Sequence, residues 1–356
     1  MVNADSNSRK LPSDNPIVKL DEDVLQRTSA VENLVQGVLN LDASRGATVG
    51  VFGPWGSGKT SFINLARQSF EQEGVPVLDF NPWLFSGTEQ LVARFFSELS
   101  AEMDQSQWSR KIAPAFKKYG QALGTTVSAA SALLTIPQIV AIIDDLTKFA
   151  DIALQQDSIN SLRKKTEKAL ECRNEPIIVV LDDVDRLSSK EIREVFKLVR
   201  LTAGFPNLIY IVLCDRHRVE RALDEPEQKL CGRDYLEKII QWPFSLPEIP
   251  INLLKEQLAE AIDQVLADIK NPNPLNVEVW DDVCEKIIRP LIRNMRDIRR
   301  YALAIRATAA GLKGRVALTD VLALEAIRLF LPDIFRLLPG AIDGLTASSQ
   351  WVKKYT

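Results

Sequence analysis

The sequence predicts an α/β fold with a central parallel sheet flanked by helices. Four short apolar runs are typical of buried strands, and helical patterns separate them: "ATVGVFG", "VPVLDFNPW", "EPIIVVLDDVDRL" and "NLIYIVLCD". The first run leads through a glycine-rich loop into a helical segment, "SFINLARQSFEQEG", and then into the second run. Strand, helix and strand in this order form a βαβ unit, which implies a parallel sheet.

The chain of 356 residues is long enough for more than one domain. The proline-rich stretch "FSLPEIPI" turns the chain out of the α/β layer, and everything after it has a helical pattern. We expect the following organisation: a disordered leader at 1–20, an α/β core at 21–250 with a helical insertion at about 87–174, a helical lid at 251–345, and a tail or linker at 346–356.

Two helix starts are indicated by capping residues. In "DEDVLQRTSAVENLVQGVLNL" the apolar residues fall at helical spacing, and Thr28 or Ser29 is expected to cap the helix, with Glu32 at capping-box distance from Ser29. In "SSKEIREVFKLVRLTAGF" the expected cap is Ser188 or Ser189.

Composition narrows the functional classes. Apolar residues make up 46% of the chain and charged residues 26%, which is an ordinary globular balance. A formal net charge of −3 disfavours a dedicated nucleic-acid binder. The four cysteines are scattered without metal-ligand spacing, and the polar N-terminus does not match a signal peptide, so we expect a cytoplasmic protein.

One uncharged run, 119–143, is long enough to span a bilayer. It contains glutamines, a proline and many serines and threonines, so its hydrophobicity is borderline. A small-residue helix buried against the sheet or a partner is the favoured interpretation, and a membrane-associated segment is the alternative.

The segment "GPWGSGKT" matches the P-loop pattern G-x-x-x-x-G-K-[ST] at every fixed position, with a strand before it and a helix after it. Its glycines let backbone N–H groups surround phosphate oxygens, and the following helix adds its positive end. Lys59 is expected to reach the terminal phosphates and Thr60 to bind Mg²⁺. The expected nucleotide-binding residues are Gly53, Pro54, Trp55, Gly56, Ser57, Gly58, Lys59, Thr60 and Ser61.

Magnesium also needs a carboxylate, and the strand that ends in "IIVVLDD" supplies Asp182 for that role. If the nucleotide is hydrolysed, an acid must orient water, and Asp183 is the first candidate and Asp185 the second. An arginine must also meet the charge that develops on the phosphate, and the candidates are Arg186, Arg216 and an arginine of "RNMRDIRRY".

Two tryptophans accompany these motifs. Trp55 lies inside the phosphate-binding segment and could pack beside the phosphates or shield them. Trp83, in "FNPW", is expected to pack in the protein interior, as aromatic side chains most often do.

Together these motifs resemble the KAP family of P-loop NTPases. The matching segments are "GPWGSGKT", "DFNPWLFSGTEQL", "VVLDDVDRL", "IVLCDRHRVERAL", "YLEKIIQWPFSLP" and "RNMRDIRRY", which follow the family's order from Asp14 to Thr346. The sequence departs from the pattern at Leu187, where a cysteine is common.

The resemblance implies ATP with Mg²⁺, an α/β core and a C-terminal helical lid. It implies that Lys59 and Thr60 bind phosphate and metal, that Asp182 holds the metal, that Asp183 activates water and that Arg296 senses the nucleotide from the lid. It also implies self-association, protein partners in a larger complex, and links to phage exclusion or membrane-associated signalling.

These implications favour a slow ATPase that acts as a conformational switch. A nucleotide-binding scaffold without turnover, a nucleic-acid-processing ATPase and a small-molecule kinase are the alternatives. The acidic balance and the absence of a basic, aromatic stripe count against the nucleic-acid alternative.

Overall fold

A computed structural model of the chain describes residues 15–85, 91–104, 112–122, 160–173, 175–202, 204–224, 231–267, 275–312 and 316–343. The chain divides into two compact units, which we call the α/β unit and the helical unit. The α/β unit is Pro16–Pro247, and the helical unit combines Met1–Asn15 with Glu248–Thr356.

The α/β unit is built on a five-stranded parallel sheet with the order β2-β3-β4-β1-β5, which confirms the predicted fold class. Because every pairing is parallel, all five strands end at the same edge of the sheet. The strands are β1 (Ala47–Phe52), β2 (Val77–Phe80), β3 (Ile177–Leu181), β4 (Leu208–Cys214) and β5 (Trp242–Ser245).

The fifth strand is absent from the sequence-based prediction. Its residues, Trp-Pro-Phe-Ser, form only four positions, and Pro243 has no N–H to donate to a sheet. Strand β5 is an outermost strand that pairs with β1 on one side. A proline is tolerated in such a strand because its other side needs no N–H donor. The segment "FSLPEIPI", which the sequence predicts to turn away from the sheet, therefore begins with the last two residues of β5.

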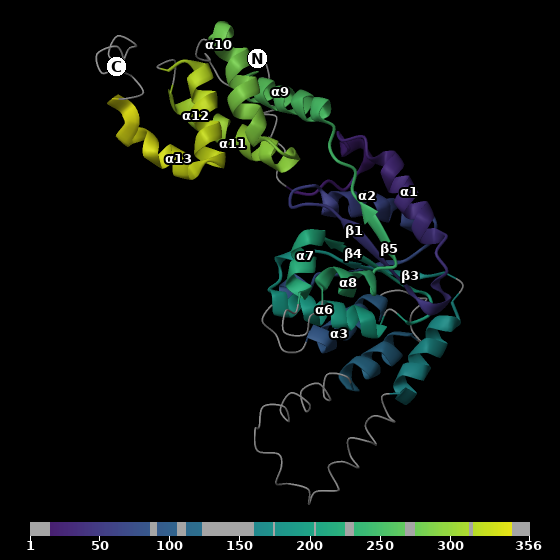
Figure 1. The fold of residues 1–356 in the computed structure, drawn as a ribbon. Coiled ribbons are helices and arrows are strands. Elements are labelled where there is room, and N and C mark those ends of the chain that lie inside the picture. The colour runs from purple at the N-terminus through teal and green to yellow at the C-terminus, as the bar shows by residue number, and fades with distance from the viewer. Residues whose placement is uncertain are drawn as a thin grey trace, which may run out of the picture. The chain divides into compact units, whose positions relative to one another are not determined.

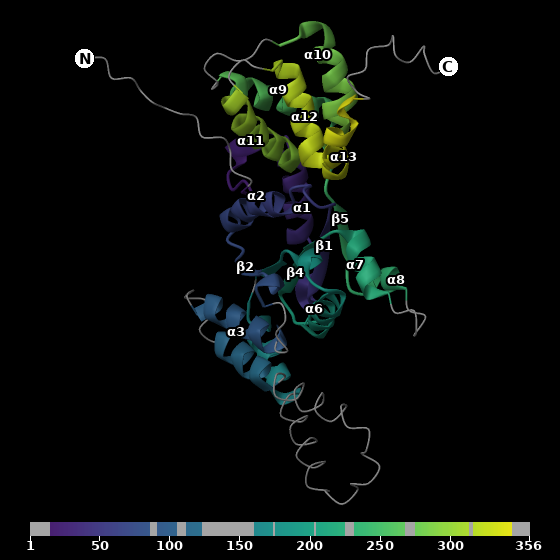
Figure 2. The ribbon, with the colours of Figure 1, turned by 90° about the vertical axis from the view of Figure 1, so that its left-hand side faces the viewer.

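Helices cover both faces of the sheet (Figures 1 and 2). One face, with Ile178 and Val180 of β3, packs in a core that includes Val31 and Phe62 from α1 and α2. The other face packs against α3, α6, α7 and α8. The helices are α1 (Thr28–Leu39), α2 (Lys59–Gln72), α3 (Leu91–Asp104), α6 (Ser189–Thr202), α7 (Arg216–Leu223) and α8 (Gly232–Glu237); 112–122 and 160–171 are also helical.

The start of α1 differs from the prediction. Thr28 is its first residue and Arg27 its N-cap residue, and no side chain caps the helix. Instead, the Asp23 carboxylate accepts hydrogen bonds from the backbone N–H groups of Leu25 and Arg27 at 3.2 and 2.6 Å. These bonds fix the turn before the helix. The predicted cap at Ser188 is present, since its hydroxyl accepts a bond from Glu191 N at 3.4 Å.

The predicted leader, 1–20, is wrong for its last residues. The backbone of Ile17 bonds to Ser61 and Asn64 of α2, and the Val18 carbonyl accepts a bond from Gln68. Residues 17 and 18 therefore lie along α2, because polar side chains of that helix supply partners for their backbone groups. Residues 1–14 lie outside the described residues.

The helical unit has its own core, centred on Leu258, Ile288, Tyr301, Ile305 and Leu322. A π-helical turn, Cys284–Ile288, follows α10, and a 3₁₀ turn, Arg289–Leu291, follows it in turn. Pro290 accounts for this change, because it cannot donate the backbone hydrogen bond that continues an α-helix. The helices are α9 (Ile251–Ala267), α10 (Val277–Val283), α11 (Met295–Leu312), α12 (Leu318–Phe330) and α13 (Pro332–Leu337).

Most of the uncharged run 119–143 lies outside the described residues. Its first residues end a helical segment, 112–122, in which Tyr119 is buried against Phe96 and Phe205. Among the helices that the structure describes, none is long and apolar enough to cross a membrane.

We predict that Gly232→Ala destabilises the α/β unit. A Cβ atom at Gly232 would lie 1.9 Å from the Glu220 carbonyl oxygen and 2.8 Å from Asp224 N, and this backbone cannot move without separating α7 from α8. The expected loss in the free energy of unfolding is about 1–3 kcal/mol. The control is Gly204→Ala, whose Cβ meets only the end of the Arg163 side chain at 3.5 Å. Urea unfolding that gives equal midpoints for both variants would contradict this packing.

Candidate functional site

The loop between β1 and α2 has a backbone that requires glycine. Gly56 and Gly58 have φ values of 81° and 85°, in the left-handed region that other residues rarely adopt. Gly53 is constrained by space instead, since a Cβ atom there would lie 2.5 Å from Ser57 Oγ. The three glycines of the motif thus fit this tight turn.

The loop presents hydrogen-bonding groups that suit a phosphate. Gly58 precedes α2, and the first backbone N–H groups of a helix have no partner within it. The hydroxyl of Ser57 is buried, and among the described residues it has no hydrogen-bond partner. A phosphate oxygen is a suitable partner for both, so the residues present fit a nucleotide's phosphates.

Lys59 lies folded into this loop. Its Nζ donates to the carbonyl oxygen of Gly53 at 3.0 Å and lies 3.4 Å from that of Pro54. It also forms an ion pair with Asp185 Oδ2 at 3.1 Å, and the two side chains are only 10% and 3% exposed. The cation is therefore already at the loop, held by a buried carboxylate.

Thr60 and Asp182, the two predicted metal ligands, lie in contact. Thr60 Oγ1 donates to Asp182 Oδ2 at 2.8 Å, although the residues are 122 positions apart. Burial raises the pKa of Asp182 above its ordinary value, while hydrogen bonds from Thr60 and from the Asp183 N–H act in the opposite direction.

This pair fits a magnesium site. Mg²⁺ is commonly held by one or two protein oxygens together with waters and substrate phosphates. In the part of the chain that the structure describes, no group of three or more His, Cys, Asp or Glu residues is arranged to hold a metal. Waters and the nucleotide's oxygens would complete the coordination of a cation bound by this pair.

Asp183 adopts a left-handed backbone conformation, with a φ of 57°, and both of its carboxylate oxygens have partners. Oδ1 pairs with Arg186 Nε at 2.6 Å, and Oδ2 accepts a hydrogen bond from Asn81 Nδ2 at 3.1 Å. Asn81 directly follows β2, the strand beside β3. The predicted water-activating acid is therefore restrained on both sides.

The guanidinium of Arg186 contacts two indole rings. Its Cζ lies 5.1 Å from the ring centroid of Trp55 and 5.5 Å from that of Trp83, distances typical of cation–π contacts. Trp83 is 46% exposed, so the expectation that it packs in the interior is wrong. Its partner is the charged guanidinium of Arg186, which keeps contact with water on one side. The Trp83 ring that contacts it therefore lies at the surface.

Asp185 and Ser61 face other partners. Asp185 is buried, and its Oδ2 accepts the backbone N–H of Asp215 at 3.1 Å in addition to pairing with Lys59. The Ser61 hydroxyl accepts the N–H of Ile17 at 3.2 Å, so its side chain faces the N-terminal segment. Its ion pair with Lys59 is thus the link between Asp185 and the phosphate loop.

Arg216 and Arg296, two further predicted arginines, belong to different units of the chain. Arg216, in α7, pairs with Glu220 at 2.7 Å and lies 5.6 Å from the ring centroid of Phe52. Arg296 is the second residue of α11, in the helical unit.

Sequence reasoning missed two residues that contact the site. Asn81 was part of a recognised motif, and its signal was an amide directly after a strand, where ligand-binding groups gather. Arg27 donates from Nη1 to the Ser57 carbonyl at 2.7 Å. No local pattern marks Arg27, because the contact joins residues 30 positions apart.

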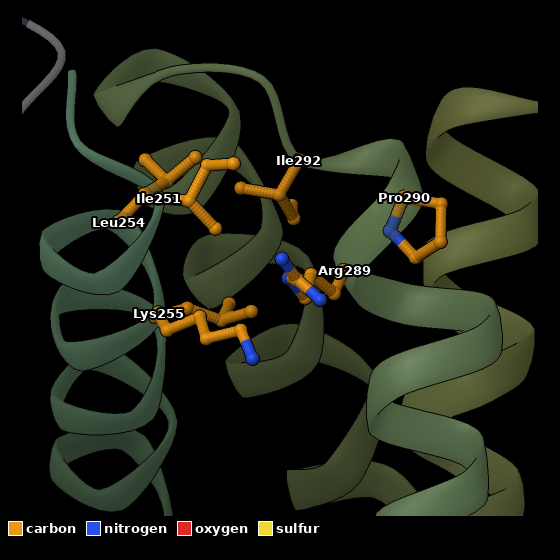
Figure 3. Close-up of a pocket in the computed structure, with 7 residues that line it drawn as sticks. Ile251, Leu254, Lys255, Arg289, Pro290 and Ile292 are labelled. Carbon is orange, nitrogen blue, oxygen red and sulfur yellow. The ribbon is translucent and has the colours of Figure 1, made fainter.

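The helical unit has a groove of about 250 Å³ of its own (Figure 3). Leu254, Leu258 and Ile292 supply apolar lining, and Lys255 and Arg289 point into it. Both cations pair with Glu285, at 2.9 and 2.6 Å, so this one carboxylate offsets one of the two positive charges.

A sequence model of the KAP family P-loop domain matches residues 27–312. The phage T7 exclusion protein of Escherichia coli strain K12 is 27% identical over an alignment of 330 residues, which covers 85% of this chain and 44% of that protein. The chain thus spans less than half the length of this curated relative.

Two solved structures from Thermotoga maritima are similar at low identity. A RuvB mutant is 11% identical, with 88% of this chain and 73% of that chain covered and a TM-score of 0.39. Domain III of the replication initiation protein DnaA is 16% identical, with 86% and 91% covered and a TM-score of 0.36.

We predict that Lys59→Met lowers the free energy of unfolding by about 3 kcal/mol, because it leaves the buried Asp185 carboxylate without its cation. Adding Asp185→Asn removes that charge while keeping an oxygen for Asp215 N, so the double variant should regain more than half of the loss. Exposed Lys190→Met serves as the control, and denaturant unfolding measures all four proteins. A single variant as stable as the control would show that the pair contributes little.

Proposed function

The chain belongs to the KAP family of P-loop domains, and on this basis we propose that it binds ATP with Mg²⁺ and hydrolyses it slowly as a conformational switch. The bond between Thr60 Oγ1 and Asp182 Oδ2 is the observation that most supports this proposal. It joins the phosphate loop to the end of the acidic strand, and these are the two parts that an NTPase needs together.

The residues of the loop have distinct roles in this proposal. The N–H groups at the start of α2 (59–61) and the Ser57 hydroxyl bind phosphate oxygens, and Lys59 contributes the positive charge. Thr60 and Asp182 hold Mg²⁺, directly or through water. When bound, this ion neutralises charge on the phosphate oxygens. Asp185 positions Lys59 through their ion pair. In this proposal it acts through Lys59 and does not itself bind the phosphate.

Asp183 is the proposed acid that orients water. Its two oxygens contact Arg186 and Asn81, and each oxygen keeps a second lone pair that can accept a hydrogen bond from water. The ion pair with Arg186 competes with water for this carboxylate, which supports slow turnover. Asn81 and Arg186 are then positioning residues that hold the acid between turnovers.

The same pairing favours a second candidate, a nucleotide-binding scaffold without useful turnover. If the contacts with Asn81 and Arg186 keep Asp183 from orienting an attacking water, bound ATP is held and not cleaved. The two candidates predict the same nucleotide affinity and different rates of phosphate release.

The relative from Escherichia coli is named for phage exclusion, and we propose a related role for this chain, as an ATP-dependent component of a larger assembly that acts against phage. The proposal includes self-association and further protein partners. A phage plating assay with wild type and Lys59→Ala tests it, and equal plaque counts with both would count against the defensive role.

We predict that Asp183→Asn lowers steady-state phosphate release at least about 100-fold while ATP affinity changes less than about threefold, because an amide cannot accept the proton of an attacking water. Phosphate release and isothermal titration measure the two quantities. Lys59→Ala, in contrast, should abolish ATP binding itself. Exposed Asp42→Asn, on the loop before β1, serves as the control. Undiminished release by Asp183→Asn would exclude this acid, and no release by the wild type would favour the scaffold.

We also predict that Arg296→Ala reduces turnover about tenfold or more and ATP affinity much less, as expected if the helical unit senses the nucleotide in the transition state. The comparison variant is Arg299→Ala in the same helix. A parallel loss of affinity and turnover in Arg296→Ala would argue against a sensor role.

A further inference from the structure

Arg27 is a buried guanidinium that bridges two loops of the α/β unit. Its Nη1 donates to the carbonyl oxygen of Ser57 at 2.7 Å, and its Nη2 donates to that of Pro247 at 3.1 Å. Arg27 is only 7% exposed. Burial lowers its pKa, and the nearby Asp23 carboxylate acts in the opposite direction. A cation so placed depends on its acceptors, and two backbone carbonyls are among them.

At one end, this bridge sets the direction of a peptide group in the phosphate loop. In a planar trans peptide the carbonyl and the following N–H point in opposite directions. Holding the Ser57 carbonyl therefore aims the Gly58 N–H away from Arg27. The contact is close, since a Cβ atom at Gly58 would lie 3.2 Å from Arg27 Nη1. A movement of the Gly58 backbone toward Arg27 would therefore displace the guanidinium.

At the other end, the bridge holds the last residue of the α/β unit. Pro247 follows β5, and the helical unit begins at Glu248. The preceding residue, Leu246, donates its N–H to the Phe52 carbonyl at 2.8 Å, and its Cβ would lie 3.5 Å from a Cβ placed on Gly53. The departing chain thus lies against the first residue of the phosphate loop, and Arg27 ties it to Ser57 as well.

The guanidinium joins these two ends rigidly. Its donors are fixed in one plane, so a shift that keeps one carbonyl bonded moves or breaks the bond to the other. A lysine would keep the positive charge but supplies a single flexible ammonium group, without the planar fork.

We propose that Arg27 is a positioning residue that couples the state of the phosphate loop to 246–250, the segment through which the chain passes into the helical unit. This inference rests on the proposed binding of nucleotide at the loop. It identifies how a nucleotide could act on the helical unit through bonds within the α/β unit alone.

Hydrogen–deuterium exchange of the full chain, with and without saturating MgATP, tests the coupling. In the wild type, ATP should slow exchange in peptides that cover 53–60 and change it in peptides that cover 242–254. In Arg27→Met and Arg27→Lys the effect on 53–60 should persist, while the effect on 242–254 should fall about fivefold or more, the lower end of typical coupling between sites. Exposed Arg45→Met should behave as the wild type does.

The outcomes separate this inference from the function on which it rests. An equal response of 242–254 in wild type and Arg27→Lys would overturn the coupling, and so would ATP binding by the wild type without any response there. If 53–60 shows no response and titration detects no ATP binding, nucleotide binding itself fails, and the coupling fails with it. If Arg27→Met does not fold, Arg27→Lys, which retains the charge, decides the question.

Discussion

The parallel direction of all five strands is the constraint on which the site depends. Since parallel strands end at one edge of the sheet, residues far apart in the sequence follow those ends side by side: Asn81 after β2, Asp182 after β3, Asp215 after β4 and Gly53 after β1. The contacts of Thr60 with Asp182, and of Asn81 with Asp183, are consequences of this arrangement. A strand in the opposite direction would carry its acid to the other edge.

Strand β4 lies between β1 and β3, so its end separates the phosphate loop from the acids that follow β3. The Lys59–Asp185 ion pair and the hydrogen bond from Asp215 N to Asp185 connect the two across the end of β4. A buried ion pair is not in itself a source of stability. Here it holds the lysine at the loop, as the proposed contact of Lys59 with phosphate requires.

The motifs could be predicted from the sequence because they are local. The glycines of the loop, the apolar strands and the acids that follow β3 lie within a few residues of one another. Strand β5 was missed because four residues with a proline give too weak a pattern. The partners of Asp183, the exposure of Trp83 and the bridge from Arg27 were missed because each depends on which distant loops meet, and no spacing rule encodes that.

The left-handed backbone at Asp183 restricts which residues this position can accept. Glycine, asparagine and aspartate tolerate that conformation best, whereas longer and branched side chains are disfavoured. Of these three, only aspartate carries a carboxylate. Under the proposed role of Asp183, a substitution by glycine or asparagine would keep this backbone conformation and remove only the carboxylate, so turnover and folding are separable at this position.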